Sequence, residues 1–265
     1  MKIGHVLMVK DENDIIYYHL NYYKNLGFKD FYILDNGSTD GTYQLIEKFI
    51  SENPQFRIHL EVDLEVTYNQ HQRVNKLINL AYNEGCNWVL PVDTDELLIN
   101  NQNFTNFNIY EFLNNIPEGD FIKLKWWYYR PTDNDDETEV NPFVKINHRD
   151  AEQQSSQTKI LVKWKPGMYV VQGNHLLVDE HQYKEITELS YTISYAHFWQ
   201  RSLQQMIKKT TNLGEAHRNI DTNRNEYMFY QSYLTEGQNL IINHFNHYKN
   251  ELLQEYSQFP KESFL

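Results

Sequence analysis

Three acidic side chains follow directly after an apolar segment of the chain. Residues 88–92 are apolar, and Asp93, Asp95 and Glu96 come within the next four positions. Because Asp93 and Asp95 stand two positions apart, they would share one face of an extended segment and could reach one cation. Mg²⁺ and Mn²⁺ prefer oxygen ligands and keep positions open for phosphate oxygens. The acids therefore predict a divalent-cation site that can neutralise a diphosphate, with a solvated turn after a strand as the alternative.

The elements upstream must place these acids at the end of a strand. Apolar runs predict strands, and apolar positions at helical spacing between them predict helices that stop at Gly27 and Gly85. This alternation is typical of a parallel sheet covered by helices on both faces, in which ligands bind at the carboxyl ends of the strands. The predicted strands are residues 3–9, 31–34, 57–62 and 88–92.

Polar segments follow three of these strands, and together they resemble a known family. Residues 9–13 read Val-Lys-Asp-Glu-Asn, residues 35–42 read Asp-Asn-Gly-Ser-Thr-Asp-Gly-Thr, and residues 92–96 read Val-Asp-Thr-Asp-Glu. These strings resemble the nucleotide-sugar-binding half of the GT-A glycosyltransferases, most of all the family 2-like group with its kinship to family 92. The resemblance is specific over residues 3–100, and it departs from the family at Asp11, where Asn is more common.

The resemblance implies a role for each of these polar strand ends. Asp35 would accept a hydrogen bond from the imide of a uracil-like base, and Lys10 and Glu12 would border the base and ribose. Asp93 would face the ribose or the metal, and Asp95 the metal. The implied cofactors are Mn²⁺ or Mg²⁺ and a UDP-sugar, whose diphosphate the ion bridges.

Thinner matches to the family continue downstream. They lie at residues 157–160, 173–175 and 196–202. Lys159 and Arg201 are candidates for contacting the diphosphate. His175 and His197 are each expected to close a strand, and either could be the third metal ligand, with His197 favoured by its match to the family. A helix that began at His197 would place His197 and Arg201 on one face. The alternatives are structural histidines and solvated basic side chains.

The same resemblance implies inversion at the anomeric carbon. Inversion needs a carboxylate that acts as general base for the acceptor hydroxyl, on the face opposite the leaving diphosphate. The sequence does not single out this base. The candidates are Glu96, Asp150, Asp179 and Glu180.

Four aromatic residues occupy positions 126–129, after an alternating strand predicted over residues 121–125. Two of the four rings should face each side of the sheet. Rings on the cleft side could stack on the apolar face of an acceptor sugar, whereas rings on the other side would pack in the core.

The second half of the chain is richer in predicted strands, and the tail reads as helices. The predicted strands there include residues 143–146, 159–162 and 168–171, and the acids between 133 and 139 are expected to form a solvated loop. The predicted fold is α/β of the GT-A, Rossmann-like type: a mostly parallel sheet with helices on both faces, a strand-rich acceptor half and C-terminal helices. The predicted boundaries are 1–202 for the catalytic domain, divided into 1–100 and an acceptor half 101–202, and 203–265 for the helical extension.

Composition excludes several classes of protein. A formal net charge of −12 argues against a nucleic-acid substrate, because phosphate backbones need a basic face. The one cysteine, Cys86, precludes an internal disulfide and is expected to be a small buried apolar residue in a reducing compartment. Met1 and Lys2 lead straight into the first strand, and no apolar run approaches about 18 residues, so we expect no signal peptide or transmembrane helix. A cytoplasmic protein is expected, with peripheral contact at the inner face of the membrane left open.

The predicted function is a metal-dependent, inverting glycosyltransferase of the hexosyltransferase type. It would move a sugar from a nucleotide-sugar donor to a carbohydrate acceptor in surface polysaccharide or glycan synthesis. One alternative is a sugar nucleotidyltransferase, which would need a glycine-rich, arginine-containing loop where residues 10–13 stand. The other is a non-catalytic carbohydrate-binding protein with the same fold, which would not hydrolyse the donor.

Overall fold

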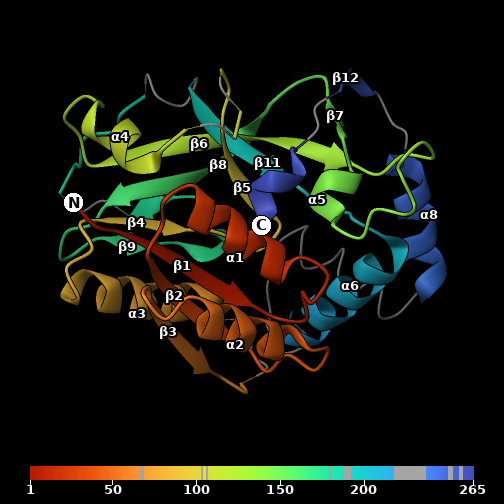
Figure 1. Ribbon diagram of the computed structural model, residues 1–265, viewed down its shortest axis with the longest axis horizontal. Helices are drawn as coiled ribbons and strands as arrows, with labels where there is room; N and C mark the ends of the chain where they lie inside the picture. The colour runs from red at the N-terminus through yellow and green to blue at the C-terminus, as the bar shows by residue number, and fades with distance from the viewer. Residues whose placement is uncertain are drawn as a thin grey trace.

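The computed structural model describes most of the chain (Figure 1). The described residues are 1–65, 69–102, 104–105, 107–178, 181–187, 192–217, 237–249, 253–256 and 259–265. Two candidate bases, Asp179 and Glu180, lie outside these ranges, and so do residues 218–236 of the tail.

The N-terminal half alternates strand and helix, as the apolar pattern predicts. Its elements are β1 (Ile3–Val9), α1 (Ile16–Asn25), β2 (Asp30–Asp35), α2 (Thr42–Glu52), β3 (Arg57–Val62), α3 (Gln70–Asn83) and β4 (Trp88–Pro91). The strands run parallel in the order β3-β2-β1-β4. Because successive strand residues face opposite sides, Ile3 and Leu7 pack in the cluster that contains α1 and α2, whereas Val6 packs with α3. Helices therefore cover both faces, which confirms the predicted fold class.

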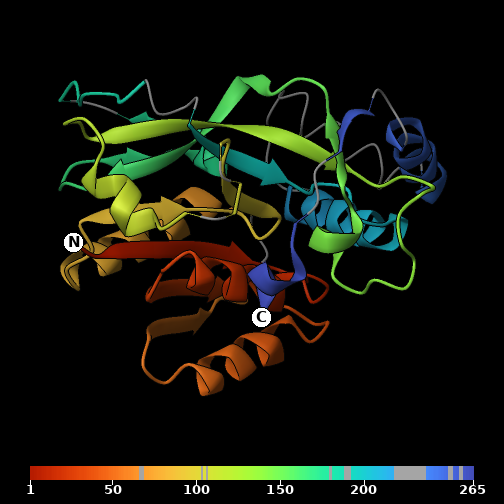
Figure 2. The same cartoon turned by 45° about the horizontal axis from the view of Figure 1, so that its top comes forward.

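Beyond β4 the sheet continues with strands from the second half of the chain. These are β8 (Gln154–Lys163), β6 (Phe121–Arg130), β7 (His148–Asp150) and β12 (Leu253–Tyr256), each antiparallel to the one before. In Figure 2 the yellow-green and green strands β6, β7 and β8 lie above the red and orange N-terminal elements. β5 (Glu96–Asn100) pairs with β11 (Ile193–His197), which also runs parallel to β6. This pairing sets His197 opposite Glu96 and beside Tyr128.

One predicted strand is instead a short helix. Residues 142–145 form α5 (Pro142–Lys145), although Phe143, Val144 and Ile146 suggest a strand. The Asn141 side chain accepts a hydrogen bond from the Phe143 backbone amide at 3.0 Å, and proline occupies the first helical position. These are helix-start signals that override a β-branched pattern over so few residues. The other short elements are α4 (Ile109–Asn114), β9 (Tyr169–Val170), η1 (Gln172–Asn174) and β10 (Leu177–Val178).

In its described residues the tail contains the helices α6 (Leu203–His217) and α8 (Gln238–Tyr248), as predicted. They pack on each other through an apolar cluster that includes Met206, Ile241 and Phe245 and is separate from the two main cores. The tail also forms β12 and the turn η3 (Lys261–Phe264), which the sequence pattern did not predict. The α6–α8 pair is therefore a small apolar unit that must be joined to the sheet by other contacts.

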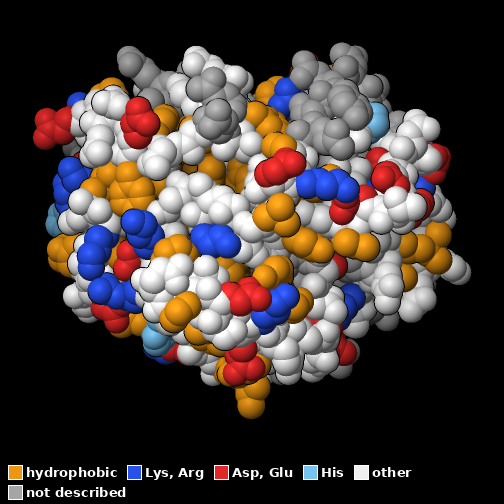
Figure 3. Space-filling model, in the orientation of Figure 1, with side chains coloured by type: hydrophobic (Ala, Val, Ile, Leu, Met, Phe, Trp, Pro, Cys, Tyr) orange, Lys and Arg blue, Asp and Glu red, His pale blue; other side chains and the backbone are white. Residues whose placement is uncertain are grey.

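One prediction about burial is confirmed and another is wrong. Cys86 is fully buried, as predicted. Asp135 is also buried, contrary to the predicted solvated loop, because its carboxylate accepts hydrogen bonds from the amide and hydroxyl of Thr132. On the face drawn in Figure 3, basic side chains lie among acidic ones without forming an unbroken basic field. In the described residues, no helix has the length and apolar character needed to cross a membrane.

Candidate functional site

The acids after β4 lie in a turn, so they do not form the extended pair that the sequence suggested. The Glu96 amide donates to the Asp93 carbonyl at 3.1 Å, and the chain then enters β5. Asp95 and Glu96 are buried, whereas Asp93 is partly exposed. Because of the turn, Asp93 and Asp95 point to different partners instead of sharing one face.

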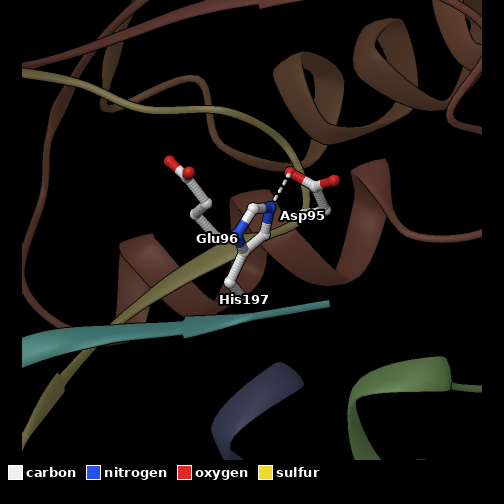
Figure 4. A group of neighbouring side chains, drawn as sticks. All are labelled: Asp95, Glu96 and His197. Carbon is white, nitrogen blue, oxygen red and sulfur yellow. Dashed lines mark ion pairs between the residues drawn. The ribbon is translucent and has the colours of Figure 1, made fainter. Parts of the chain in front are cut away.

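Within the described part of the chain, Asp95, Glu96 and His197 form a cluster that could hold a metal ion (Figure 4). Each offers a ligand atom, and these atoms lie within 4.8 Å of one another. The imidazole of His197 lies between the two carboxylate side chains in Figure 4, with Nε2 3.6 Å from Asp95 Oδ1. His197 Nδ1 is buried and makes no hydrogen bond to any described residue. Two carboxylates and an imidazole fit Mn²⁺ chemically.

Lys159 connects Asp93 to this cluster. Its Nζ lies 2.5 Å from Asp93 Oδ2 and 3.0 Å from Glu96 Oε1, and it donates to the Gly173 carbonyl at 2.8 Å. Burial alone would lower the pKa of Lys159, but the two carboxylates outweigh burial and raise it. Burial also raises the pKa of Glu96. The other Asp93 oxygen accepts from Gln70 Nε2 at 3.1 Å.

Asp95 is surrounded by cations. Lys209 of α6 forms an ion pair with Asp95 Oδ2, and an Arg201 nitrogen lies 3.9 Å from the same oxygen. Burial would raise the pKa of Asp95, but Lys209, His197 and Arg201 together hold it well below its usual range. Asp95 is therefore charged at neutral pH.

Arg201 forms ion pairs with the loop that follows β1. Its guanidinium forms an ion pair with Glu12, donates to Asp14 at 2.8 Å and to the Phe198 carbonyl at 3.2 Å. Burial raises the pKa of Glu12 to about 7, although Arg201 opposes this shift. The predicted helix at His197 is wrong, because α6 begins at Leu203. Arg201 is buried and does not line the cavity described next.

A cavity of about 680 Å³ opens at the carboxyl ends of β1 and β4. Seven of the predicted site residues line it, and they come from both halves of the chain. These are Lys10, Glu12, Asp93, Asp95, Lys159, His175 and His197. The structure thus brings together most of the predicted donor, diphosphate and metal residues.

Asp35 lies behind this lining rather than in it. It is buried at the end of β2, and its Oδ1 accepts from the Ser38 amide at 2.8 Å. Its Oδ2 is buried and makes no hydrogen bond to any described residue. The next residue, Asn36, lines the cavity, and its carbonyl accepts from Lys10 Nζ at 2.8 Å. Asp35 therefore offers an unused acceptor one residue away from the cavity wall.

His175 follows η1 and does not close a strand as predicted. Its Nδ1 lies 3.0 Å from the Thr158 carbonyl, and its ring packs 6.0 Å from that of Trp126. Burial, followed by the charge of Lys159, lowers the pKa of His175 to about 4, so the ring is neutral at pH 7. One of its nitrogens is already engaged, and the ring lies outside the three-residue cluster.

The aromatic run on β6 alternates as predicted. Trp126 and Tyr128 line the cavity, and Tyr128 stacks on His197 with ring centroids 5.3 Å apart. Trp127 contacts Arg149 at 3.9 Å instead, and Tyr129 packs in the core. The structure therefore sends one pair of rings to the cavity and the other pair away from it.

Of the described candidates for the base, one lies in the cluster. Glu96 contacts Lys159 and belongs to the cluster with His197. Asp150 on β7 is instead paired through both carboxylate oxygens with Arg130 and does not line the cavity.

Sequence reasoning missed the contribution of α6. Lys209, Asn212, Leu213 and Ala216 line the cavity. Their spacing of i, i+3, i+4 and i+7 marks one face of a helix, so the helical period could have grouped them. No local signal pointed to Asp95, which lies 114 positions away from Lys209 in the sequence.

Comparisons with known proteins give distant similarities. No protein-family model and no curated protein matches the chain. The similar solved structures include the mannosyltransferase PcManGT from Pyrobaculum calidifontis in complex with GDP-Man and Mn²⁺, at 13% identity and TM-score 0.46, covering 93% of this chain and 73% of that one. S. aureus TarS 1-349 in complex with UDP has 14% identity and TM-score 0.41, with 89% and 70% covered. HddC from Yersinia pseudotuberculosis has 11% identity and TM-score 0.40, with 71% and 89% covered.

Proposed function

We propose that this chain is a GT-A-type glycosyltransferase that transfers a sugar from a UDP-sugar to a carbohydrate acceptor with the help of Mn²⁺ or Mg²⁺. The observation that carries the proposal is the cavity at the carboxyl ends of β1 and β4. Asp95 and three lysines, Lys10, Lys159 and Lys209, line this one volume of about 680 Å³. An acid for a divalent ion and cations for phosphate oxygens, gathered in one concave site, match the needs of a nucleoside diphosphate.

The divalent ion would be held by Asp95, Glu96 and His197, whose donor atoms already lie close together. When bound, such an ion supplies positive charge to the diphosphate as it leaves. Of the two roles predicted for Asp93, the proposal takes the one toward the ribose, because its oxygens contact Lys159 and Gln70.

The donor base would lie against the end of β2. The free Oδ2 of Asp35 suits the imide N–H of uracil. Lys10 and Glu12 line the adjoining wall, as expected for groups that border base and ribose.

The acceptor would lie on the second half of the chain. The rings of Trp126 and Tyr128 face the cavity and offer apolar surfaces on which a sugar ring can stack. This supports the division into a donor half at 1–100 and an acceptor half at 101–202, with 203–265 covering the cavity through α6. The same proposal includes inversion at the anomeric carbon, a role in surface polysaccharide or glycan synthesis, and kinship to the family 2-like group of GT-A glycosyltransferases.

Calorimetry and donor turnover test this function. UDP should bind in the presence of Mn²⁺ and much more weakly in excess chelator, and one UDP-sugar of a panel should release UDP slowly even without acceptor. Asp95→Asn should remove this release while the circular dichroism spectrum stays unchanged. Release of pyrophosphate from UTP and a sugar 1-phosphate would instead indicate a nucleotidyltransferase. Glycan binding without any donor hydrolysis would indicate a binding protein.

A further inference from the structure

Lys209 forms an ion pair with a carboxylate that the metal would need as a ligand. Asp95 belongs to the cluster with Glu96 and His197, yet its Oδ2 is ion-paired with Lys209 Nζ. Asp95 and Lys209 both line the cavity. A divalent ion on Asp95 would place like charges next to each other, and such repulsion is strong where side chains are shielded from water. Lys209 and the ion therefore compete for one partner.

The Lys209 side chain can leave Asp95 without undocking its helix. Neighbouring residues of α6 hold the loops after β1 and β2: Lys208 Nζ lies 2.6 Å from Asp40 Oδ2, and Asn212 donates to Asp11 at 2.8 Å. Arg201, just before the helix, adds ion pairs with Glu12 and Asp14. These contacts fix the helix whatever partner Lys209 has.

The other cations of the cavity keep their partners. Lys159 has Asp93 and the Gly173 carbonyl in addition to Glu96, and Lys10 donates to two backbone carbonyls. Among the described residues, Asp95 is the only carboxylate within ion-pairing distance of Lys209. Lys209 is thus the cation that a metal on Asp95 would release.

We propose that Lys209 changes partner during donor binding: it neutralises Asp95 in the free protein and contacts the donor diphosphate once Asp95 holds the divalent ion. This inference rests on the proposed function, and it deepens it by assigning a diphosphate-binding lysine to α6. Its consequence is that Lys209 opposes metal binding in the absence of nucleotide and favours nucleotide binding in the presence of metal.

The test measures Mn²⁺ binding to the nucleotide-free protein by electron paramagnetic resonance of the unbound ion, and UDP binding at saturating Mn²⁺ by calorimetry. Lys209→Met should tighten Mn²⁺ binding by about tenfold, because the substitution removes a positive charge that repels the ion; this lies within the roughly 5–150-fold range of energetic coupling between binding sites. The same variant should weaken UDP binding. Lys208→Met, on the same helix but paired with Asp40, is the matched control and should change the Mn²⁺ affinity less than twofold. Lys209→Arg keeps the charge and should leave the Mn²⁺ affinity near that of the parent.

Two results would overturn the exchange. The first is a Mn²⁺ affinity of Lys209→Met that is unchanged or weaker, and the second is UDP binding that is insensitive to the substitution. A third result would also contradict the exchange: the parent binds UDP equally well in excess chelator, and Lys209→Met does not bind UDP. The lysine would then take the place of the metal instead of exchanging partners with it. If the parent binds neither Mn²⁺ nor UDP, the proposed function fails, whatever the variants do. Should Lys209→Met not fold, Lys209→Gln serves the same comparison.

Discussion

Removing the Lys159 ammonium should destabilise the fold far more than removing an exposed lysine with a similar ion pair. The Lys159 side chain is 4% exposed and lies 2.5 Å from Asp93 and 3.0 Å from Glu96. Lys159→Met would leave two carboxylates without their cation, one of them buried. Breaking a buried pair in this way costs about 3–5 kcal/mol. The Gly173 carbonyl would also lose its donor.

Lys76 provides the control. It pairs with Glu61 at 2.9 Å, but its side chain is 68% exposed. Water and salt screen such a pair, so Lys76→Met should cost about 0–1 kcal/mol. Urea denaturation at pH 7, followed by circular dichroism, gives the free energy of unfolding of each variant. A Lys159→Met protein within about 1 kcal/mol of the parent would refute the reasoning, because the fold would then tolerate the uncompensated carboxylates.

The pH dependence has a definite sign. Burial raises the pKa of Glu96 above its usual value, and Lys159 opposes this shift. Without Lys159 the pKa should rise further. A carboxyl group with a raised folded-state pKa takes up a proton on folding, so stability increases as pH falls toward its unfolded pKa. The deficit of Lys159→Met relative to the parent should therefore shrink between pH 7 and pH 5. A deficit that grows over this interval would contradict the assignment.

Three further substitutions test the donor, metal and acceptor parts of the site. Asp35→Ala should weaken UDP binding in calorimetry by about 1–3 kcal/mol, the range for a lost hydrogen bond to a charged group, and equal affinity would remove Asp35 from the base pocket. His197→Ala should raise the Mn²⁺ concentration needed for half-maximal donor hydrolysis, and an unmoved titration curve would make the histidine structural. Tyr128→Ala should raise KM for the acceptor with little effect on donor hydrolysis. Trp127→Ala is the control and should leave KM for the acceptor unchanged, because the Trp127 ring contacts Arg149. Equal effects of the two substitutions on KM would argue against stacking.

Local patterns predicted the N-terminal half well. The strands β1, β2 and β4 are buried and mostly apolar, the helices between the strands include two that end at Gly27 and Gly85, and both glycines adopt the positive φ that such helix ends favour. The parallel arrangement then fixes where the polar strand ends meet. Lys10, Glu12, Asp93 and Asp95 consequently line one cavity, as expected.

The parts that failed depend on contacts between distant residues. The Asp-x-Asp spacing suggested one shared face, but a turn at Asp93 sends the two carboxylates to Lys159 and Lys209. His175 is held by η1, where Gly173 and Asn174 both have positive φ. Such a backbone follows from its tertiary partners and not from its own composition. A four-residue apolar segment such as 143–146 is likewise too short for periodicity to separate strand from helix.

The arrangement of charges links donor binding to the docking of α6. Its apolar face packs on α8 in a separate cluster, so the described contacts that join it to the donor half are polar. Asp11, Asp40 and Asp95 of that half each hold a group on α6. In the proposed exchange, a bound diphosphate would replace Asp95 as the anionic partner of Lys209, so that α6 would contact the donor directly. Since a ligand that binds one arrangement of a protein increases its population, donor binding should make α6 a more firmly held wall of the cavity, and the acceptor would then meet an already completed site.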